Sequence, residues 1–569
     1  MCGFIVAYGN NLKKKIDFKK FKNVSSLIKH RGPDFYKHEV TEDFFLFHSR
    51  LSIVDLDGRS NQPFYSENNR YILVYNGEIY NYLEIKKTLK NKYNFKTSSD
   101  TEVLLAAYVE WGKDLLKYID GMFSFVIIDK KEKNIFIARD HFGQKPLYYH
   151  LNKDFILISS EIKPLLKLVN EKEFNYKTFS NYLTFNFYAE DKNTFFKSIN
   201  QLKPGHFGLY KNNELKTFDY ALIEKEIGES YKPFDCNELI SILTKSSNDH
   251  LMGDVDVGLA VSSGLDSLSL LGLIMNSPKS KKLTECFTLD YGESFSEFDE
   301  AKKSISQLGM KTNRVVYTPK EMVKDFEKLV YFNEAPIGGV MHLGMSKLCK
   351  FAKQKGIKVL FNGTGLDEVL LGYKSSIQML EKKNKFFKRD LTLIDGSKVE
   401  VSKLLKIKSE QSNVAHFHNL TLDLLMISKL PKNLHMLDRA SMMHSVEMRN
   451  PFVSLKIVKY FLNLSYKNFY KKKLTKIPLR DSMQKIYPKL NWYNQKKYIQ
   501  TPQNNWLREK KSKEFFGDII NSKNKFDDEF FVKKEIKNYW DKFIKNKLKV
   551  GFPIWQYTNL YFIEKIKFD

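Results

Sequence analysis

The sequence predicts two domains of different fold class: an α+β domain, in which an antiparallel β sandwich lies between helices, and an α/β domain with a parallel sheet. The chain has 569 residues, too many for one ordinary core. Residues 1–207 contain short alternating apolar runs joined by polar turns, which is typical of antiparallel hairpins. Residues 235–569 begin with alternating strands and helices, which favours a parallel sheet covered on both faces. The polar, lysine-rich residues 208–234 are predicted to be a linker.

Composition narrows the classes of function. Hydrophobic residues make up 42% of the chain, as in packed domains, and no apolar run reaches the 18 residues that suggest a membrane span, so we expect a cytoplasmic protein. The net charge of +27 raises nucleic acid as a partner. Most of that charge is lysine spread along the chain, with only eleven arginines, which disfavours this partner. Four scattered cysteines indicate neither a disulfide framework nor a zinc site.

Cys2 directly precedes a short apolar strand, and its position matters more than its residue type. If Met1 is removed, the thiol and a free α-amino group belong to the same residue. Such an amine has a pKa of about 7.7 to 8.0, so it can take the thiol proton directly or through a water. Cys2 is therefore a candidate N-terminal nucleophile.

Polar groups recur at the ends of apolar runs over the next hundred residues. They include His48 to Asp55, Tyr75 to Asn81, and Thr97 to Glu102 ahead of a helix predicted over residues 103–118. Two of these segments also have a purely structural interpretation: Asn76-Gly77 can be a hairpin turn, and Asp100 can be a helix cap.

Together these segments resemble the glutaminase domain of class II glutamine amidotransferases, specifically that of the asparagine synthetase family, over residues 1–207. The resemblance implies an N-terminal-nucleophile fold in which Cys2 attacks the side-chain amide of glutamine, while Asn76 and the Gly77 amide form the oxyanion hole. It also implies a set of glutamine-binding residues: Arg50 for the carboxylate, Glu78 and Asp100 for the α-amino group, and Leu51, Ile53, Val54, Asn76 and Gly77 around them. A zwitterion needs one cation and one or two anions, so these charges suit glutamine.

Residues 258–276 read as a buried strand, a turn of small residues and an apolar helix. The turn, Ser262 to Ser267, offers amides and hydroxyls at a helix N-terminus, where an anion such as a phosphate is favoured. Asp266 would repel a bare phosphate, so it argues for a magnesium-bound nucleotide. An N-cap cluster on an ordinary core helix is the plainer reading. The turn resembles the pyrophosphate loop of ATP pyrophosphatases, S-G-G-x-D-S, with Ser263 in place of one glycine.

A second loop, Asn362 to Glu368, follows the strand at residues 357–361 and resembles a signature of the same synthetases. The segments from Asp438 to Phe452 and from Lys476 to Arg480 also resemble that family. The resemblance implies Mg²⁺ bound by Asp266 and Asp367, and Lys476 facing the pyrophosphate. The implied ATP-binding residues are Val261, Ser262, Gly264, Asp266, Ser267, Leu289, Asn362, Gly363 and Lys476.

The sequence as a whole predicts a glutamine amidotransferase whose substrates are glutamine, ATP and a carboxylate acceptor, with ATP and Mg²⁺ as cofactors. Aspartate, giving asparagine, AMP and pyrophosphate, is the first choice of acceptor. Thr364 stands where the family carries an acid, and Ser454 replaces another family aspartate, so a sugar acid of surface polysaccharide synthesis is the alternative. A nucleic-acid-modifying or nucleic-acid-binding protein is the alternative from another class. The sequence leaves the oligomeric state undecided, with a homodimer as one option.

Overall fold

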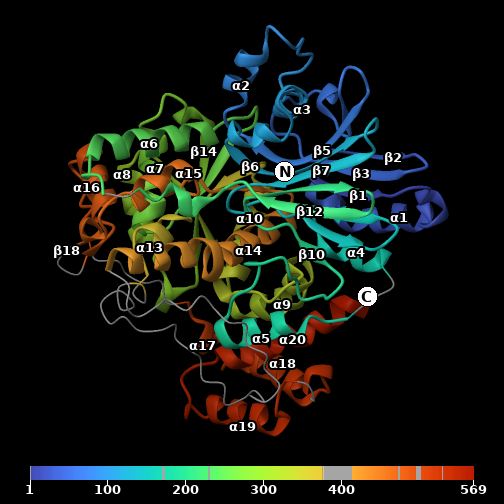
Figure 1. The fold of residues 1–569 in the computed structure, drawn as a ribbon. Coiled ribbons are helices and arrows are strands. Elements are labelled where there is room, and N and C mark those ends of the chain that lie inside the picture. The colour runs from blue at the N-terminus through green and yellow to red at the C-terminus, as the bar shows by residue number, and fades with distance from the viewer. Residues whose placement is uncertain are drawn as a thin grey trace.

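The computed structural model describes residues 2–169, 173–228, 231–373, 376, 413–471, 474–494, 501–527 and 530–568 (Figure 1). Within these ranges no helix is long and apolar enough to cross a membrane.

Two six-stranded antiparallel sheets form the first domain. One runs in the order β10 (Asn200–Gln201), β8 (Tyr148–Leu151), β9 (Ile156–Ser159), β1 (Gly3–Tyr8), β3 (Phe44–Arg50), β2 (Phe35–Val40). The other runs in the order β12 (Glu214–Asp219), β11 (His206–Lys211), β7 (Asn134–Arg139), β6 (Gly121–Asp129), β5 (Tyr71–Ile79), β4 (Phe64–Tyr65).

The two sheets face each other across an apolar core to which β1, β3, β5 and β6 all contribute, through residues such as Phe4, Leu46, Val74 and Val126. Four helices cover the outer faces: α1 (Phe18–Ser25) and α4 (Ile162–Leu168) on the first sheet, and α2 (Tyr82–Leu89) and α3 (Asp100–Trp111) on the second. The predicted antiparallel sandwich between helices is therefore confirmed. The helix predicted over residues 103–118 continues beyond α3 as a 3-10 turn, Gly112–Lys117.

The segment 208–219, predicted to be linker, belongs instead to the second sheet. Strand β11 pairs with β7, and β12 pairs with β11. The prediction was wrong for this segment because β12 lies at the edge of the sheet with most of its side chains exposed, so its polar sequence reads as a loop.

A five-stranded parallel sheet forms the second domain, in the order β15 (Thr312–Val316), β14 (Leu283–Asp290), β13 (Val257–Ala260), β16 (Val359–Phe361), β17 (Glu447–Arg449). One face packs against a core shared with α6 (Cys236–His250), α7 (Leu265–Met275), α15 (Leu455–Leu462) and α16 (Ile477–Ile486). The other packs on α10 (Val340–Gln354). The predicted parallel sheet is confirmed, and β13 and β16 are neighbours, so their carboxyl ends meet at one edge.

The C-terminal helices join the two domains. Helices α18 (Lys510–Asn521) and α20 (Phe552–Phe568) pack against α9 (Pro319–Asn333), and α20 also contacts α5 (Tyr176–Phe185). Helix α19 (Lys533–Ile544) packs on α18 (Figure 1). Their side chains share one apolar core with the first domain, in which Trp555 of α20 is fully buried. Phe526, in the 3-10 turn Lys525–Asp527 between α18 and α19, belongs to the same core, with its ring 4.8 Å from the Phe179 ring.

Candidate active site

Cys2 is buried, 8% exposed, immediately before β1. Its backbone is held from both sides, because its N–H donates to Asn76 Oδ1 (3.0 Å) and its carbonyl accepts from Arg31 Nε (3.1 Å). Burial raises the pKa of the Cys2 thiol above its ordinary value, while a backbone hydrogen bond at Leu51 and the charge of Arg50 act in the opposite direction. A fixed thiol that is mostly protonated needs a base to act as a nucleophile.

Asn76 and Gly77 lie inside β5, paired with β6, so the hairpin-turn reading is wrong. Asn76 Nδ2 is buried and has no hydrogen-bond partner among the described residues, which leaves a donor beside Cys2. A Cβ at residue 77 would lie only 2.1 Å from the carbonyl oxygen of Met122, so glycine is needed there by close approach.

We expect Gly77→Ala to destabilise the protein by about 1–3 kcal/mol, because the added methyl must push β5 away from β6. The temperature of thermal unfolding should fall. Gly517→Ala is the matched control: it lies inside α18 with only a van der Waals contact at 3.7 Å, and alanine is favoured in a helix by up to about 1 kcal/mol. Equal effects of the two substitutions would contradict the prediction.

The Arg50 guanidinium lies at the end of β3 and is 5% exposed. It donates to the carbonyl oxygens of Val54 (3.2 Å), Asp55 and Asp57 (2.9 Å), and to Asn61 Oδ1 (2.8 Å). The loop after β3 therefore curls around this side chain and holds its charge in one place. Leu51, Ile53 and Val54 are buried in the same loop.

Glu78 and Asp100 are both buried. Asp100 Oδ2 accepts from the Tyr75 hydroxyl (2.8 Å) and from the Ile79 amide (3.0 Å), so it binds β5, while Ser99 caps the helix. The capping reading of Asp100 is therefore wrong. Burial raises the pKa of both carboxyl groups, and for Glu78 the neighbouring Glu447 raises it further. A cation between these carboxyl groups would favour their charged form.

The phosphate-loop candidate follows β13 and leads into α7, as predicted. Ser267 Oγ accepts from the Ser262 amide (3.1 Å), and Ser262 Oγ accepts from the Gly264 amide (3.1 Å), so the hydroxyls shape the turn. Ser263 donates to Glu297 Oε2 (2.8 Å) and does not have a positive φ, so its Cβ causes no backbone strain. Val261 is buried at the start of the loop.

Lys476 joins the two loops. Its Nζ lies 2.5 Å from Asp266 Oδ2 and 2.5 Å from Asp367 Oδ1, and the side chain is only 2% exposed. Burial alone would lower the pKa of Lys476, but the two carboxylates more than offset this and raise it to about 12. A Cβ at Gly372 would lie 1.9 Å from Asp367 Oδ1, so glycine leaves room for this pair.

The residues present fit magnesium as a partner of a bound nucleotide. In the described part of the chain no three His, Cys, Asp or Glu side chains form a metal cage. Mg²⁺ is usually held by one or two carboxylates together with waters and substrate phosphates, and Asp266 and Asp367 supply two carboxylates at one point.

The second loop lies against the first. A Cβ at Gly363 would be 3.1 Å from the Ser267 amide nitrogen, so this glycine allows the loops to touch. The Thr364 hydroxyl donates to Asn362 Oδ1 (2.6 Å), which also accepts from the Thr364 amide (2.9 Å). Leu289 lies on the neighbouring strand β14.

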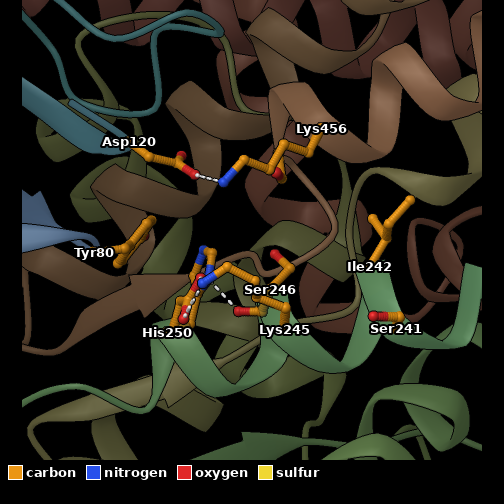
Figure 2. Close-up of a pocket in the computed structure, with 10 residues that line it drawn as sticks. Tyr80, Asp120, Ser241, Ile242, Lys245, Ser246, His250 and Lys456 are labelled. Carbon is orange, nitrogen blue, oxygen red and sulfur yellow. Dashed lines mark hydrogen bonds and ion pairs between the residues drawn. The ribbon is translucent and has the colours of Figure 1, made fainter. Parts of the chain in front are cut away.

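A separate pocket lies between the domains, beside α6 (Figure 2). The rings of Tyr80 and His250 contact each other there at a tilt of 32°, with centroids 3.8 Å apart, and Asp120 pairs with Lys456 (3.4 Å). None of the residues predicted for glutamine, ATP or magnesium lines it.

A set of buried charges at the domain interface has no role among the sequence-based predictions: Arg31, Glu161, Lys163, Glu334, Asp438, Arg439, Glu447 and Arg449. One signal was available. Arginine is rare in this lysine-rich chain, so an arginine inside an apolar segment indicates a buried ion pair.

The class of protein follows from comparison with known families. A model described as "Glutamine amidotransferase domain" matches residues 1–221, and one described as "Asparagine synthase" matches residues 238–563. The chain therefore belongs to the asparagine synthase family and carries a glutamine amidotransferase domain ahead of the synthase domain.

Several named proteins are similar to this chain. Glutamine-hydrolysing asparagine synthetase 1 of Bacillus subtilis is 31% identical, over 66% of this chain and 59% of its own length. The amidase chry2 of Gibberella zeae is 29% identical, over 61% and 54%. A Methanocaldococcus jannaschii protein named provisionally as glutamine-hydrolysing asparagine synthetase 2 is 32% identical, over 71% and 81%. The chain thus spans little more than half the length of the first two relatives.

Proposed function

We propose that the chain is an ATP-dependent glutamine amidotransferase. Its first domain hydrolyses glutamine, and its second activates a carboxylate with ATP and amidates it with the released ammonia. The observation that carries the proposal is the presence of two preorganised sites in one chain. One has a buried thiol beside an amide donor, and the other has two carboxylates gathered on one lysine at adjacent strand ends.

In the first site Cys2 attacks the side-chain amide of glutamine. After removal of Met1, the Cys2 α-amino group takes the thiol proton and passes it to the amide nitrogen, which leaves as ammonia, and a thioester on Cys2 remains. Water then cleaves this thioester, which releases glutamate and restores the thiol. Asn76 Nδ2 and the Gly77 amide donate to the oxyanion that forms on the amide oxygen. Arg50 binds the glutamine carboxylate, Glu78 and Asp100 bind its α-amino group, and Leu51, Ile53 and Val54 close the pocket.

In the second site the loop from Ser262 to Ser267 receives the phosphates of ATP at the N-terminus of α7. Asp266 and Asp367 would hold Mg²⁺, which supplies charge neutralisation on the phosphates when it is bound. Lys476 faces the departing pyrophosphate. The remaining nucleotide contacts come from Val261, Gly264, Leu289, Asn362 and Gly363. A carboxylate oxygen of the acceptor attacks the α-phosphorus, and ammonia then displaces AMP.

Aspartate is the acceptor that the family favours, and a sugar acid is the second candidate. The observation behind the second is Thr364: its hydroxyl donates to Asn362 and carries no charge, so it cannot deprotonate ammonia near neutral pH. A relative named as an amidase shows that not every similar protein is named for asparagine synthesis. A cytoplasmic location and a homodimer stay predictions.

We expect aspartate to stimulate ATP- and glutamine-dependent pyrophosphate release, with asparagine formed at about 1 per second or faster. The measurement compares aspartate, glutamate, uronic acids and nucleotide-linked uronic acids as acceptors. Stimulation by a sugar acid, with none by aspartate, would replace the main reading with the alternative. Thr364→Asp should then fail to create asparagine synthesis by itself.

A further inference from the structure

The nucleophile of the first domain is tied to the second domain by a buried pair of charges. Asp438 lies on α14 (Leu430–Met442), and Arg31 lies in the first domain, 407 positions away. The two side chains make two parallel hydrogen bonds, Nη1 to Oδ2 (2.9 Å) and Nη2 to Oδ1 (3.1 Å). Arg31 is 0% exposed and Asp438 is 4% exposed. This two-pronged geometry fixes the orientation of the guanidinium as well as its position.

A third nitrogen of the Arg31 guanidinium reaches Cys2. Its Nε donates to the Cys2 carbonyl oxygen at 3.1 Å. If Met1 is removed, the peptide bond to Gly3 is the only covalent link that Cys2 has, so the orientation of this carbonyl determines where the thiol and the α-amine point. Asp438 orients Arg31, and Arg31 orients the Cys2–Gly3 peptide.

We propose that Asp438, a residue of the synthase domain, is a positioning residue for glutamine hydrolysis: through Arg31 it holds Cys2 in the orientation needed for attack. This inference rests on the proposed function, since it takes Cys2 as the nucleophile. With Asp438 in this role, the glutaminase site is complete only when the second domain is docked. Ammonia is then released only where a synthase site lies next to it.

The same interface contains a pair that holds the domains together without touching Cys2. Lys163 of the first domain lies 2.9 Å from Glu334 of the second, and both are buried. Lys163 also contacts Glu161, and Glu161 binds Arg31 Nη1 (3.1 Å). Lys163 is therefore linked to Arg31 through Glu161, whereas Asp438 binds Arg31 directly. Lys163→Met is therefore a matched control for the loss of a buried interdomain ion pair.

We expect Asp438→Asn to lower the kcat of glutamine hydrolysis by roughly 10²-fold, because small misplacements of a reacting group cost rates of this size. The KM for glutamine should change less than about threefold, since the residues that bind glutamine are untouched. Pyrophosphate release supported by ammonium salts should keep the wild-type rate. Hydrogen–deuterium exchange should become faster in peptides that cover β1 in Asp438→Asn but not in Lys163→Met.

Equal losses of kcat in Asp438→Asn and Lys163→Met would overturn the inference, because the effect would then be one of domain docking. A double variant, Arg31→Gln with Asp438→Asn, should be no slower than Arg31→Gln alone if Asp438 acts through Arg31. Additive losses would also overturn it. A wild-type protein that hydrolyses no glutamine, but shows the expected exchange difference at β1, would contradict the proposed function and leave the positioning of Cys2 intact.

Discussion

Cys2→Ala is expected to abolish glutamine hydrolysis, with a loss of roughly 10⁴-fold or more, as for other removed nucleophiles. No other thiol can replace it. Cys286 and Cys349 are fully buried in the second domain, and Cys236 begins α6 there. Pyrophosphate release supported by ammonium salts should survive, because the carboxylates and the lysine of the second site lie in the other domain.

Cys236→Ala is the matched control for this experiment, since its thiol lies in the second domain, where it makes a long contact with Ser482 Oγ (3.7 Å). It should leave both activities unchanged. Loss of the ammonium-supported activity in Cys2→Ala, together with normal behaviour of Cys236→Ala, would contradict the separation of the two sites. Retained glutamine hydrolysis in Cys2→Ala would contradict the assignment of the nucleophile.

Much of the fold could be predicted from the sequence because local patterns determine it. The strand–loop–helix around Ser262 lies where apolar periodicity and small residues place it, and the strand predicted over 357–361 differs from β16 only by two residues at its start. Segment 208–219 was missed although its sequence carries a usable signal, the Asn212-Asn213 pair. Asparagine tolerates the positive φ that a tight hairpin turn requires, and both residues have a positive φ in the structure.

Other features could not be predicted because they depend on distant segments. Asn-Gly is a hairpin signal wherever it occurs, and only the pairing of β5 with β6 shows that Gly77 lies inside a sheet. The bond between Arg31 and Asp438 joins residues 407 positions apart, so no local pattern contains it. The contact of Asp266 and Asp367 with Lys476 could be predicted only in part. Neighbouring strands bring the two loops together, but the lysine comes from a third segment.

The second large effect is expected in the synthase domain. Asp367→Asn should lower ATP-dependent pyrophosphate release by roughly 10²-fold or more, because removing one group that stabilises transition-state charge has an effect of this size. Glutamine hydrolysis should persist, since Asp367 belongs to the other domain. Asp481→Asn is a suitable control: this carboxylate lies on α16, near Lys476 in sequence, and bonds to the Tyr493 hydroxyl (2.5 Å). Wild-type pyrophosphate release in Asp367→Asn would contradict the metal assignment.

The predicted metal site of Asp266 and Asp367 can also be tested with Lys476→Met, by thermal unfolding and without an activity measurement. In the structure the ammonium group stands between Asp266 and Asp367, so a cation can share both carboxylates only if the lysine moves away. Removing the ammonium leaves two close carboxylates that repel each other, and a divalent cation relieves this repulsion. Without ATP, Mg²⁺ or Mn²⁺ should therefore raise the thermal unfolding temperature of Lys476→Met more than that of the wild type. The double variant with Asp367→Asn should lose this response, because one carboxylate alone binds these ions weakly. An equal response of all three proteins would mean that Asp266 and Asp367 do not form a metal site.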